Sequence, residues 1–263
     1  MPRRMFETAQ KELKRGAHGA GAQARRGAGN ACASARVLTL SILTSVLMGI
    51  AGWAFLAALN MATTTREAHV WLFALLPVVN VATAWLYRNH GLRAQRGNNL
   101  VIDSTITGTP IHVRMAPLTF LCSTATHLAG GSAGREGAAV QMGGTIGWWA
   151  GGVLHLNEHE RRMAVQCGMA AFFSALFSTP LAATFFAMTI VNVGVVFYAA
   201  YIPCFTAAII AYGVAQLIGV TPTHFAVEAP AFEPAMVVRV VLLALACAVV
   251  VHLFCFVLHS AAH

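Results

Sequence analysis

Long apolar runs separated by short polar breaks make up most of this 263-residue chain. The first run covers residues 37–59, a polar break with Thr63–Glu67 follows, and a second run covers residues 70–87. A helix rises 1.5 Å per residue and the hydrocarbon core of a bilayer is about 30 Å thick, so roughly 20 apolar residues can cross it. The pattern therefore predicts two membrane-spanning helices, one over each run.

The apolar runs in the middle of the chain are shorter and are interrupted by glycine. They are residues 99–106, 115–128, 138–154, 163–177 and 181–196. Irregular backbone at membrane depth is tolerated only where protein covers it or where it lines a cavity, and broken helices are typical of the binding region of transporters. Two longer runs, residues 198–220 and 235–258, follow. No stretch alternates with the period of a strand, so we expect an all-α multi-pass membrane protein with broken, tilted helices.

Composition and charge support a membrane location and suggest an orientation. The chain is 57% hydrophobic and 10% charged, whereas a soluble domain carries about 25% charged residues. Much of the formal net charge of +8 precedes the first apolar run, where only Glu7 and Glu12 oppose the Lys and Arg residues. Such a flank stays in the cytoplasm, and the arginines of residues 88–96 mark the same side. We predict a disordered basic cytoplasmic tail over residues 1–36, a domain over residues 37–263 in the inner (plasma) membrane, and no nucleic-acid partner.

The cysteine and histidine patterns give little support for a metal site. The six cysteines are scattered without a CxxC pair, which argues against both a disulfide framework and a metal knuckle. HLNEH matches the H-x-x-E-H arrangement of inverted zinc peptidases, with His155 and His159 on one helical face, Glu158 as base, and Glu228 or Glu233 as third ligand. The segment lies in a short charged connector, EHERR, which favours a solvated helix cap instead. We expect no metal, no cofactor and no enzymatic activity.

The stretch GGSAGREGAAVQMGG, residues 130–144, carries Arg135 and Glu136 between apolar flanks. An ionisable residue inside a membrane is a functional candidate by default. The glycines let the backbone turn, and AAVQMGGTIGWW has the character of a helix, so we expect a helix to begin close to Gly137. Its first backbone N–H groups lack intrahelical acceptors, and the helix dipole adds about half a positive charge there.

This helix start predicts an anion site that either Glu136 or a free anion occupies. Ionised Glu136 would act as a tethered anion, and protonated Glu136 would swing away and admit a free one. The alternative is a structural charge pair between Arg135 and Glu136, although adjacent residues on a helix do not face each other. His127, at the end of the preceding run, either relays protons or bonds a helix-end carbonyl.

These motifs resemble those of a known family. GREGAAVQMGG resembles the Gly-(Lys/Arg)-Glu-Gly-Pro signature of the CLC chloride channels and anion/proton antiporters, in which the Glu is the external gate. Further along, CGMAAFFSALFSTPLAATFFAM resembles the next conserved block of that family. RGNNLVID, RMAPLTFLCSTATHLAGGSAGREG and PTHF are similar to the fluoride/proton antiporter branch.

The resemblance implies roles for particular residues. It implies that Glu136 is the gate and proton acceptor. It also implies an anion-facing turn formed by Gly134, Arg135, Gly137, Ala138 and Ala139. RGNNLVID stands where chloride-selective members carry Gly-Ser-Gly-Ile-Pro, which implies that a second helix opens toward the anion at Gly97, Asn98 and Asn99.

The chain departs from the family pattern at three points. Ala138 stands where chloride members have Pro and fluoride members often have Thr, and Thr189 stands where a carboxylate is usual. The sequence also covers only the first of the two inverted halves that build the family's pore. The resemblance implies passage of a halide, chloride or fluoride, coupled to protons, in a homodimer or with a partner that supplies the second half. The alternative is a non-transporting truncated half or remnant that needs such a partner.

Overall fold

The computed structural model describes residues 38–39, 41–90, 97–190, 200–220 and 233–262, and these residues are mostly helical. No strand occurs in those ranges, and the all-α prediction is confirmed. The chain divides into two compact units, Met1–Thr223 and His224–His263. The predicted tail, residues 1–36, lies outside the described residues, and the predicted domain boundaries stay predictions.

The described part of the first unit begins with a long helix, Ser41–Ala68. It continues with the 3-10 helix η1 (Val70–Leu75), α2 (Leu76–Asn89), α3 (Asn98–Thr107), α4 (Met115–Leu128), α5 (Arg135–Val153), α6 (Glu158–Phe177), α7 (Pro180–Thr189) and α8 (Tyr201–Leu217). The described part of the second unit is one long helix, α9 (Pro234–Ala262). Helices connected by short turns and loops therefore make up the described part of the first unit, and one helix makes up that of the second.

Helix lengths follow the predicted mixture of spanning and broken segments. Among the described residues, three helical segments are long and apolar enough to cross a membrane, namely Ser41–Ala68, Val70–Asn89 and Met236–Ser260. In contrast, α3 and α7 have 10 residues each, and 10 residues of helix extend only about 15 Å. These two helices are too short to cross a bilayer alone.

The first helix is longer than its apolar run predicts. The prediction ended it near residue 59 and treated Thr63–Glu67 as a loop, whereas the helix continues to Ala68. The Thr63 hydroxyl donates to the carbonyl of Leu59 at 2.9 Å, and the Thr65 hydroxyl donates to that of Met61 at 2.7 Å. Because threonine can satisfy its hydroxyl within its own helix, these polar residues do not end the helix.

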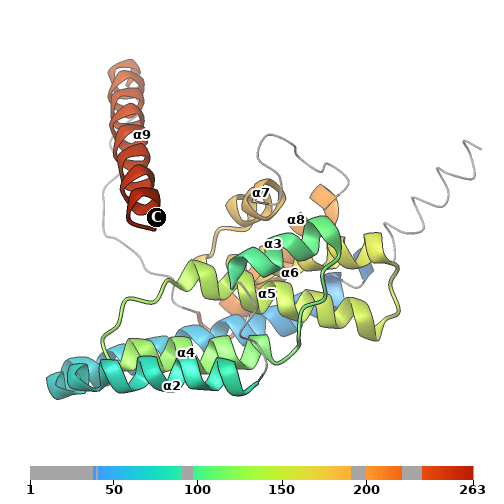
Figure 1. Cartoon of the computed structure of the whole chain (residues 1–263). Helices are drawn as coiled ribbons and strands as arrows, with labels where there is room; N and C mark the ends of the chain where they lie inside the picture. The colour runs from blue at the N-terminus through green and yellow to red at the C-terminus, as the bar shows by residue number, and fades with distance from the viewer. Residues whose placement is uncertain (1–37, 40, 91–96, 191–199, 221–232, 263) are drawn as a thin grey trace, which may run out of the picture. The chain divides into compact units, whose positions relative to one another are not determined.

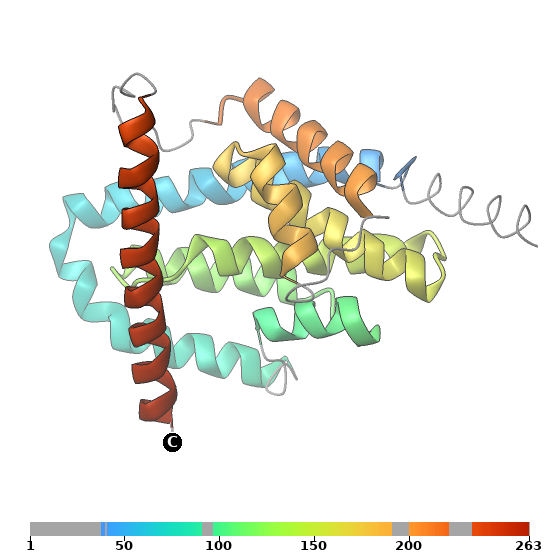
Figure 2. The same cartoon turned by 90° about the horizontal axis from the view of Figure 1, so that it is seen from above.

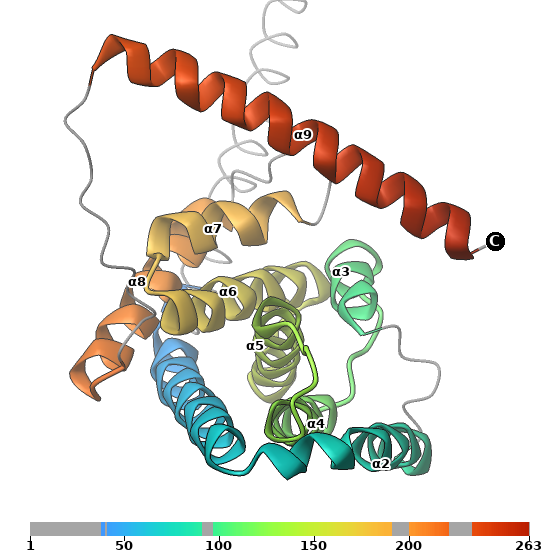
Figure 3. The same ribbon diagram turned by 90° about the vertical axis from the view of Figure 1, so that its left-hand side faces the viewer.

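Helix α5 lies at the centre of the first unit. It packs between α4 and α6, while α3 contacts both α5 and α6 (Figure 1; Figure 3). The Ser41–Ala68 helix comes close to α6 at Gly52, beside Ala175, and close to α8 at Gly49, beside Val214. Figure 2 shows the orange α8 next to the blue part of this first helix. The helices around α5 fix its axis and thereby the place of its first turn.

Glycines let the backbones of α5 and α6 touch. A Cβ atom added to Gly168 would overlap the carbonyl oxygen of Gly143, and one added to Gly147 would overlap the carbonyl oxygen of Ala164. All four residues are buried. In membrane proteins small residues allow this close approach and the van der Waals contact that it brings. The α5–α6 contact therefore depends on the absence of side chains at these positions.

We predict that Gly168→Ala destabilises the fold. The added methyl group meets backbone atoms, which cannot rotate away, so α5 and α6 must separate, and such overpacking costs about 1–3 kcal/mol. Thermal unfolding in detergent should show a lower midpoint for this variant. The matched control is Gly213→Ala in α8, where an added Cβ meets nothing within 4 Å and helix propensity favours alanine. Equal midpoints for the two variants would contradict the predicted contact.

Candidate functional site

The candidate site is built around the first turn of α5. The helix begins at Arg135, earlier than the predicted start near Gly137, and Gly134 is its N-cap with extended backbone (φ −68°, ψ 129°). The free N–H groups therefore belong to residues 134–137, because the regular helix pattern pairs the N–H of Ala138 with the carbonyl of Gly134. Ala138 and Ala139 are buried, at 5% and 0% exposure. The anion-facing turn stays a prediction, and within it the free N–H groups lie at Gly134, Arg135 and Gly137, not at Ala138 and Ala139.

Glu136 lies in this first turn and is exposed, not enclosed by apolar flanks. A Cβ atom added to Gly134 would lie 3.3 Å from Oε2 of Glu136, so the carboxylate turns back over the N-cap residue. Ion pairs join Arg66 to Glu67 and Arg162 to Glu158, whereas in the part of the chain that the structure describes none joins Arg135 to Glu136. The alternative of a structural charge pair is therefore not found.

The second predicted segment meets the first turn of α5. Helix α3 begins at Asn98, and its N-cap Gly97 adopts a positive φ of 60° that favours glycine. The side-chain nitrogen of Asn98 lies 2.9 Å from the place that a Cβ on Gly137 would occupy. Asn99, the next residue, is exposed. The structure thus brings the starts of two helices together, as the family resemblance of the two motifs implies.

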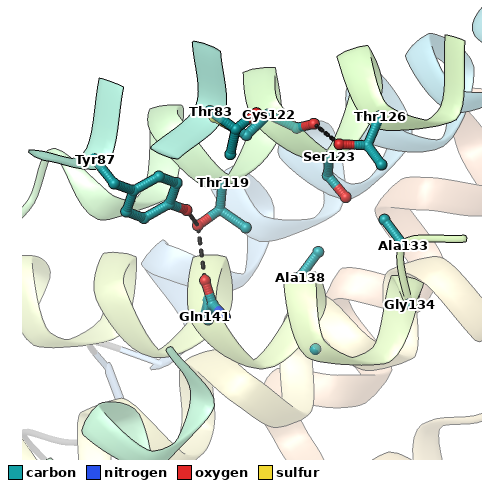
Figure 4. Close-up of a pocket in the computed structure, with 11 residues that line it drawn as sticks. Thr83, Tyr87, Thr119, Cys122, Ser123, Thr126, Ala133, Gly134, Ala138 and Gln141 are labelled. Atoms are coloured by element: carbon teal, nitrogen blue, oxygen red, sulfur yellow. Dashed lines mark hydrogen bonds between the residues drawn. The ribbon is translucent and has the colours of Figure 1, made fainter. Parts of the chain in front are cut away.

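A cavity of about 230 Å³ adjoins the same turn (Figure 4). Hydroxyl, thiol and amide side chains of three helices contribute to its lining. The lining residues are Thr83 and Tyr87 of α2, Thr119, Cys122, Ser123 and Thr126 of α4, and Ala133, Gly134, Gly137, Ala138 and Gln141 of α5 and the turn before it. The sequence interpretation missed the residues of α2 and α4. Their spacing on α4, at intervals of three and four, is that of one helical face and was the available signal.

His127 and HLNEH have structural roles. His127 Nδ1 lies 2.9 Å from the carbonyl oxygen of Ser123, so the helix-end interpretation of this histidine is confirmed. In HLNEH a turn separates α5 from α6, with His155 in the turn at φ 51°. Asn157 caps α6, accepting from the N–H of Glu160 at 2.9 Å, while Glu160 accepts from the N–H of Asn157 at 3.0 Å. His155 and His159 do not share a helix, so the peptidase geometry is wrong.

Comparison with known proteins places this helical membrane protein among ion channels and transporters. The family described as voltage gated chloride channel matches residues 79–263. A chloride/fluoride channel protein from Pseudomonas syringae pv. tomato is 39% identical over 194 residues, which are 73% of this chain and 43% of that protein. The H(+)/Cl(−) exchange transporter ClcA from Cronobacter sakazakii is 33% identical over 165 residues, 57% of this chain and 35% of that protein.

Solved structures agree with the family match. A CLC-type fluoride/proton antiporter superposes with a TM-score of 0.74 at 31% identity, covering 80% of this chain and 54% of that one. A slow cyanobacterial Cl⁻/H⁺ antiporter, with a TM-score of 0.59 at 20% identity over 71% of this chain and 47% of that one, shares the fold. The chain belongs to the CLC, or voltage gated chloride channel, family. It spans about half the length of the proteins it matches, or less.

We predict that Asn157→Ala lowers stability by about 1 kcal/mol, because it removes a side-chain acceptor from the N-terminus of α6. Asn157→Asp and Asn157→Ser should retain most of the wild-type midpoint of thermal unfolding in detergent. Zinc chloride should leave the midpoint of all these proteins unchanged. An unchanged midpoint in Asn157→Ala would contradict the capping role, and a zinc-dependent rise in the wild type would restore the metal interpretation.

Proposed function

We propose that this chain forms a wall of a proton-linked pathway for a small halide, with Glu136 as gate and proton acceptor. The observation that carries the proposal is the Glu136 carboxylate, which turns back over Gly134 at the start of α5, in the turn that also meets Asn98. A carboxylate and a halide are both anions, so each can occupy the same group of N–H donors. The site is therefore suited to exchange one for the other.

The physical basis is the free backbone at the helix start. The N–H groups of residues 134–137 have no acceptor within α5, and the helix dipole places about half a positive charge beside them. Ionised Glu136 is attracted to that charge and blocks it. Protonated Glu136 is neutral, so a free anion then binds better than the side chain does. Each exchange of carboxylate for halide thus links anion movement to a proton.

The other predicted residues divide between donating and supporting roles. Gly134, Arg135 and Gly137 supply free N–H groups, and Gly97 with Asn98 supplies the facing start of α3. Ala138 and Ala139 anchor the helix in the core. Asn99 is exposed beside Asn98 and completes the first turn of α3.

Relatives support both fluoride and chloride as the anion. Two matches are named for fluoride, the chloride/fluoride channel protein and the fluoride/proton antiporter, and both exceed 30% identity. Others are named as H(+)/Cl(−) exchange transporters. We take fluoride as the first anion to test. We further propose that the N-terminus is cytoplasmic and that the protein resides in the plasma membrane.

A second candidate function follows from the length of the chain. The chain spans about half the length of its relatives. In this second candidate, a second copy or another chain would complete the pathway. Large exposed apolar side chains on η1 and α2, such as Trp71, Phe73 and Trp85, are available to lipid or to such a partner. In this case the chain alone would not transport.

We predict that liposomes containing the purified chain release fluoride faster than empty liposomes, and that release is accompanied by proton movement. Glu136→Gln cannot exchange a proton and should lose about 100-fold or more of the coupled proton flux, since a positioned proton-transfer group typically contributes about that much. Glu136→Ala should behave alike. Glu67→Gln, which changes an exposed carboxylate paired with Arg66, is the matched control and should leave both fluxes unchanged.

Two results would contradict the proposal. Fluoride and chloride release equal to that of empty liposomes would favour the second candidate, in which the chain needs a partner. If neither Glu136 variant alters the coupled flux, Glu136 is not the gate. Fluoride electrodes and a pH dye inside the vesicles measure the two fluxes separately.

A further inference from the structure

Four side chains from four helices form one hydrogen-bonded chain that ends at the candidate site. The hydroxyls of Tyr87 (α2) and Thr119 (α4) are 3.2 Å apart. The Thr119 hydroxyl donates to Oε1 of Gln141 (α5) at 2.9 Å, and Nε2 of Gln141 donates to Oδ1 of Asn98 (α3) at 3.0 Å. Figure 4 shows the part from Tyr87 to Gln141 at the edge of the cavity.

This chain has a direction. A threonine hydroxyl has one proton, and that of Thr119 is used toward Gln141. The Tyr87 hydroxyl must therefore be the donor in its bond to Thr119. The carbonyl end of Gln141 faces Thr119 for the same reason, which leaves its NH₂ end for Asn98. Each amide in the chain is thus oriented by the hydroxyl that precedes it.

The direction decides which end of Asn98 remains available. The carbonyl oxygen of Asn98 accepts from Gln141. Its NH₂ group lies nearest to Gly137: an added Cβ there would be 2.9 Å from Nδ2 and 3.5 Å from Oδ1. A side-chain donor therefore stands beside the free N–H groups of α5. Reversal of the amide would place an oxygen there, which repels an anion.

We propose that Thr119 and Gln141 are positioning residues that set which end of the Asn98 amide meets the anion. This rests on the proposed function, in which the starts of α3 and α5 hold a halide. Thr119 is buried, at 6% exposure, so water competes little for its hydroxyl. Tyr87 adds a second bond that holds the Thr119 hydroxyl in the donating direction.

Thr119→Val tests the proposal, because valine has nearly the same shape but no hydroxyl. Without the donor, Gln141 and Asn98 can reverse, and the halide affinity should fall by about 10-fold, the loss of a hydrogen bond to a charged group. Thr119→Ser restores the hydroxyl and should restore the affinity. The matched control is Thr184→Val in α7, since Thr184 is also buried but donates to the carbonyl of Pro180 in its own helix.

The readout is the side-chain NH₂ resonance of Asn98 in the detergent-solubilised chain labelled with ¹⁵N-asparagine. Asn98→Asp identifies the signal. Titration with sodium fluoride, and separately with sodium chloride, should shift this resonance to saturation in the wild type. The half-saturating concentration should rise about 10-fold in Thr119→Val, return in Thr119→Ser, and stay unchanged in Thr184→Val. If Thr119→Val does not fold, Gln141→Met, which removes both amide bonds, is expected to give the same rise.

The outcomes separate this proposal from the proposed function, because the titration needs no transport. A halide-dependent shift of Asn98 that weakens in Thr119→Val and returns in Thr119→Ser, without fluoride release from liposomes, supports the positioning role and contradicts transport by the chain alone. Fluoride release from liposomes, together with equal half-saturating halide concentrations in the wild type and Thr119→Val, supports the transport proposal and overturns the positioning role. No halide-dependent shift of Asn98 in the wild type also overturns it.

Discussion

The candidate site depends on backbone contact between α5 and α6. Where Gly143 and Gly168 meet, neither helix has a side chain that could give way, so the axis of α5 is fixed by peptide groups. Such close-packed interiors transmit displacement instead of absorbing it. Because the first turn belongs to the same rigid helix, its position is fixed as well, although it lies at the end of α5. A halide site made of N–H groups needs that rigidity, because donors that move with the ligand discriminate poorly between anions.

A second constraint is the meeting of α3 with this turn. Both helices begin at glycine N-caps, Gly97 and Gly134, which have no side chain to satisfy the free N–H groups. Most helices use Ser, Thr, Asp or Asn at this position, and Asn157 does so for α6. Helices α2, α4, α7 and α8 also begin without a side-chain cap, so an uncapped start alone does not mark a binding turn. What sets α3 and α5 apart is that their two uncapped starts meet, with Asn98 beside Gly137.

The sequence predicts the helices well and the contacts between them poorly. The run over residues 115–128 matches α4 at both ends, and GREG locates the start of α5 to within a few residues, because apolar periodicity and glycine act locally. Thr63 and Thr65 were misinterpreted because polarity alone does not tell whether a hydroxyl bonds within its helix. The N-x-x-E pattern of Asn157 and Glu160 was a capping signal and could have excluded the peptidase. By contrast, the pairing of Gln141 with Asn98 joins distant residues, and no local pattern encodes it.

In the proposed function, the back-turned side chain of Glu136 has a consequence for occupancy. The Glu136 carboxylate belongs to the same helix as the N–H donors that it approaches. Its effective concentration at those donors is therefore about millimolar or above. A dilute halide cannot displace the ionised carboxylate by mass action. Protonation of the carboxylate weakens its binding to the N–H groups without any change in the halide concentration. Acidity, more than anion supply, would then decide when the turn is free, and a cell would admit the anion to this site in response to its proton gradient.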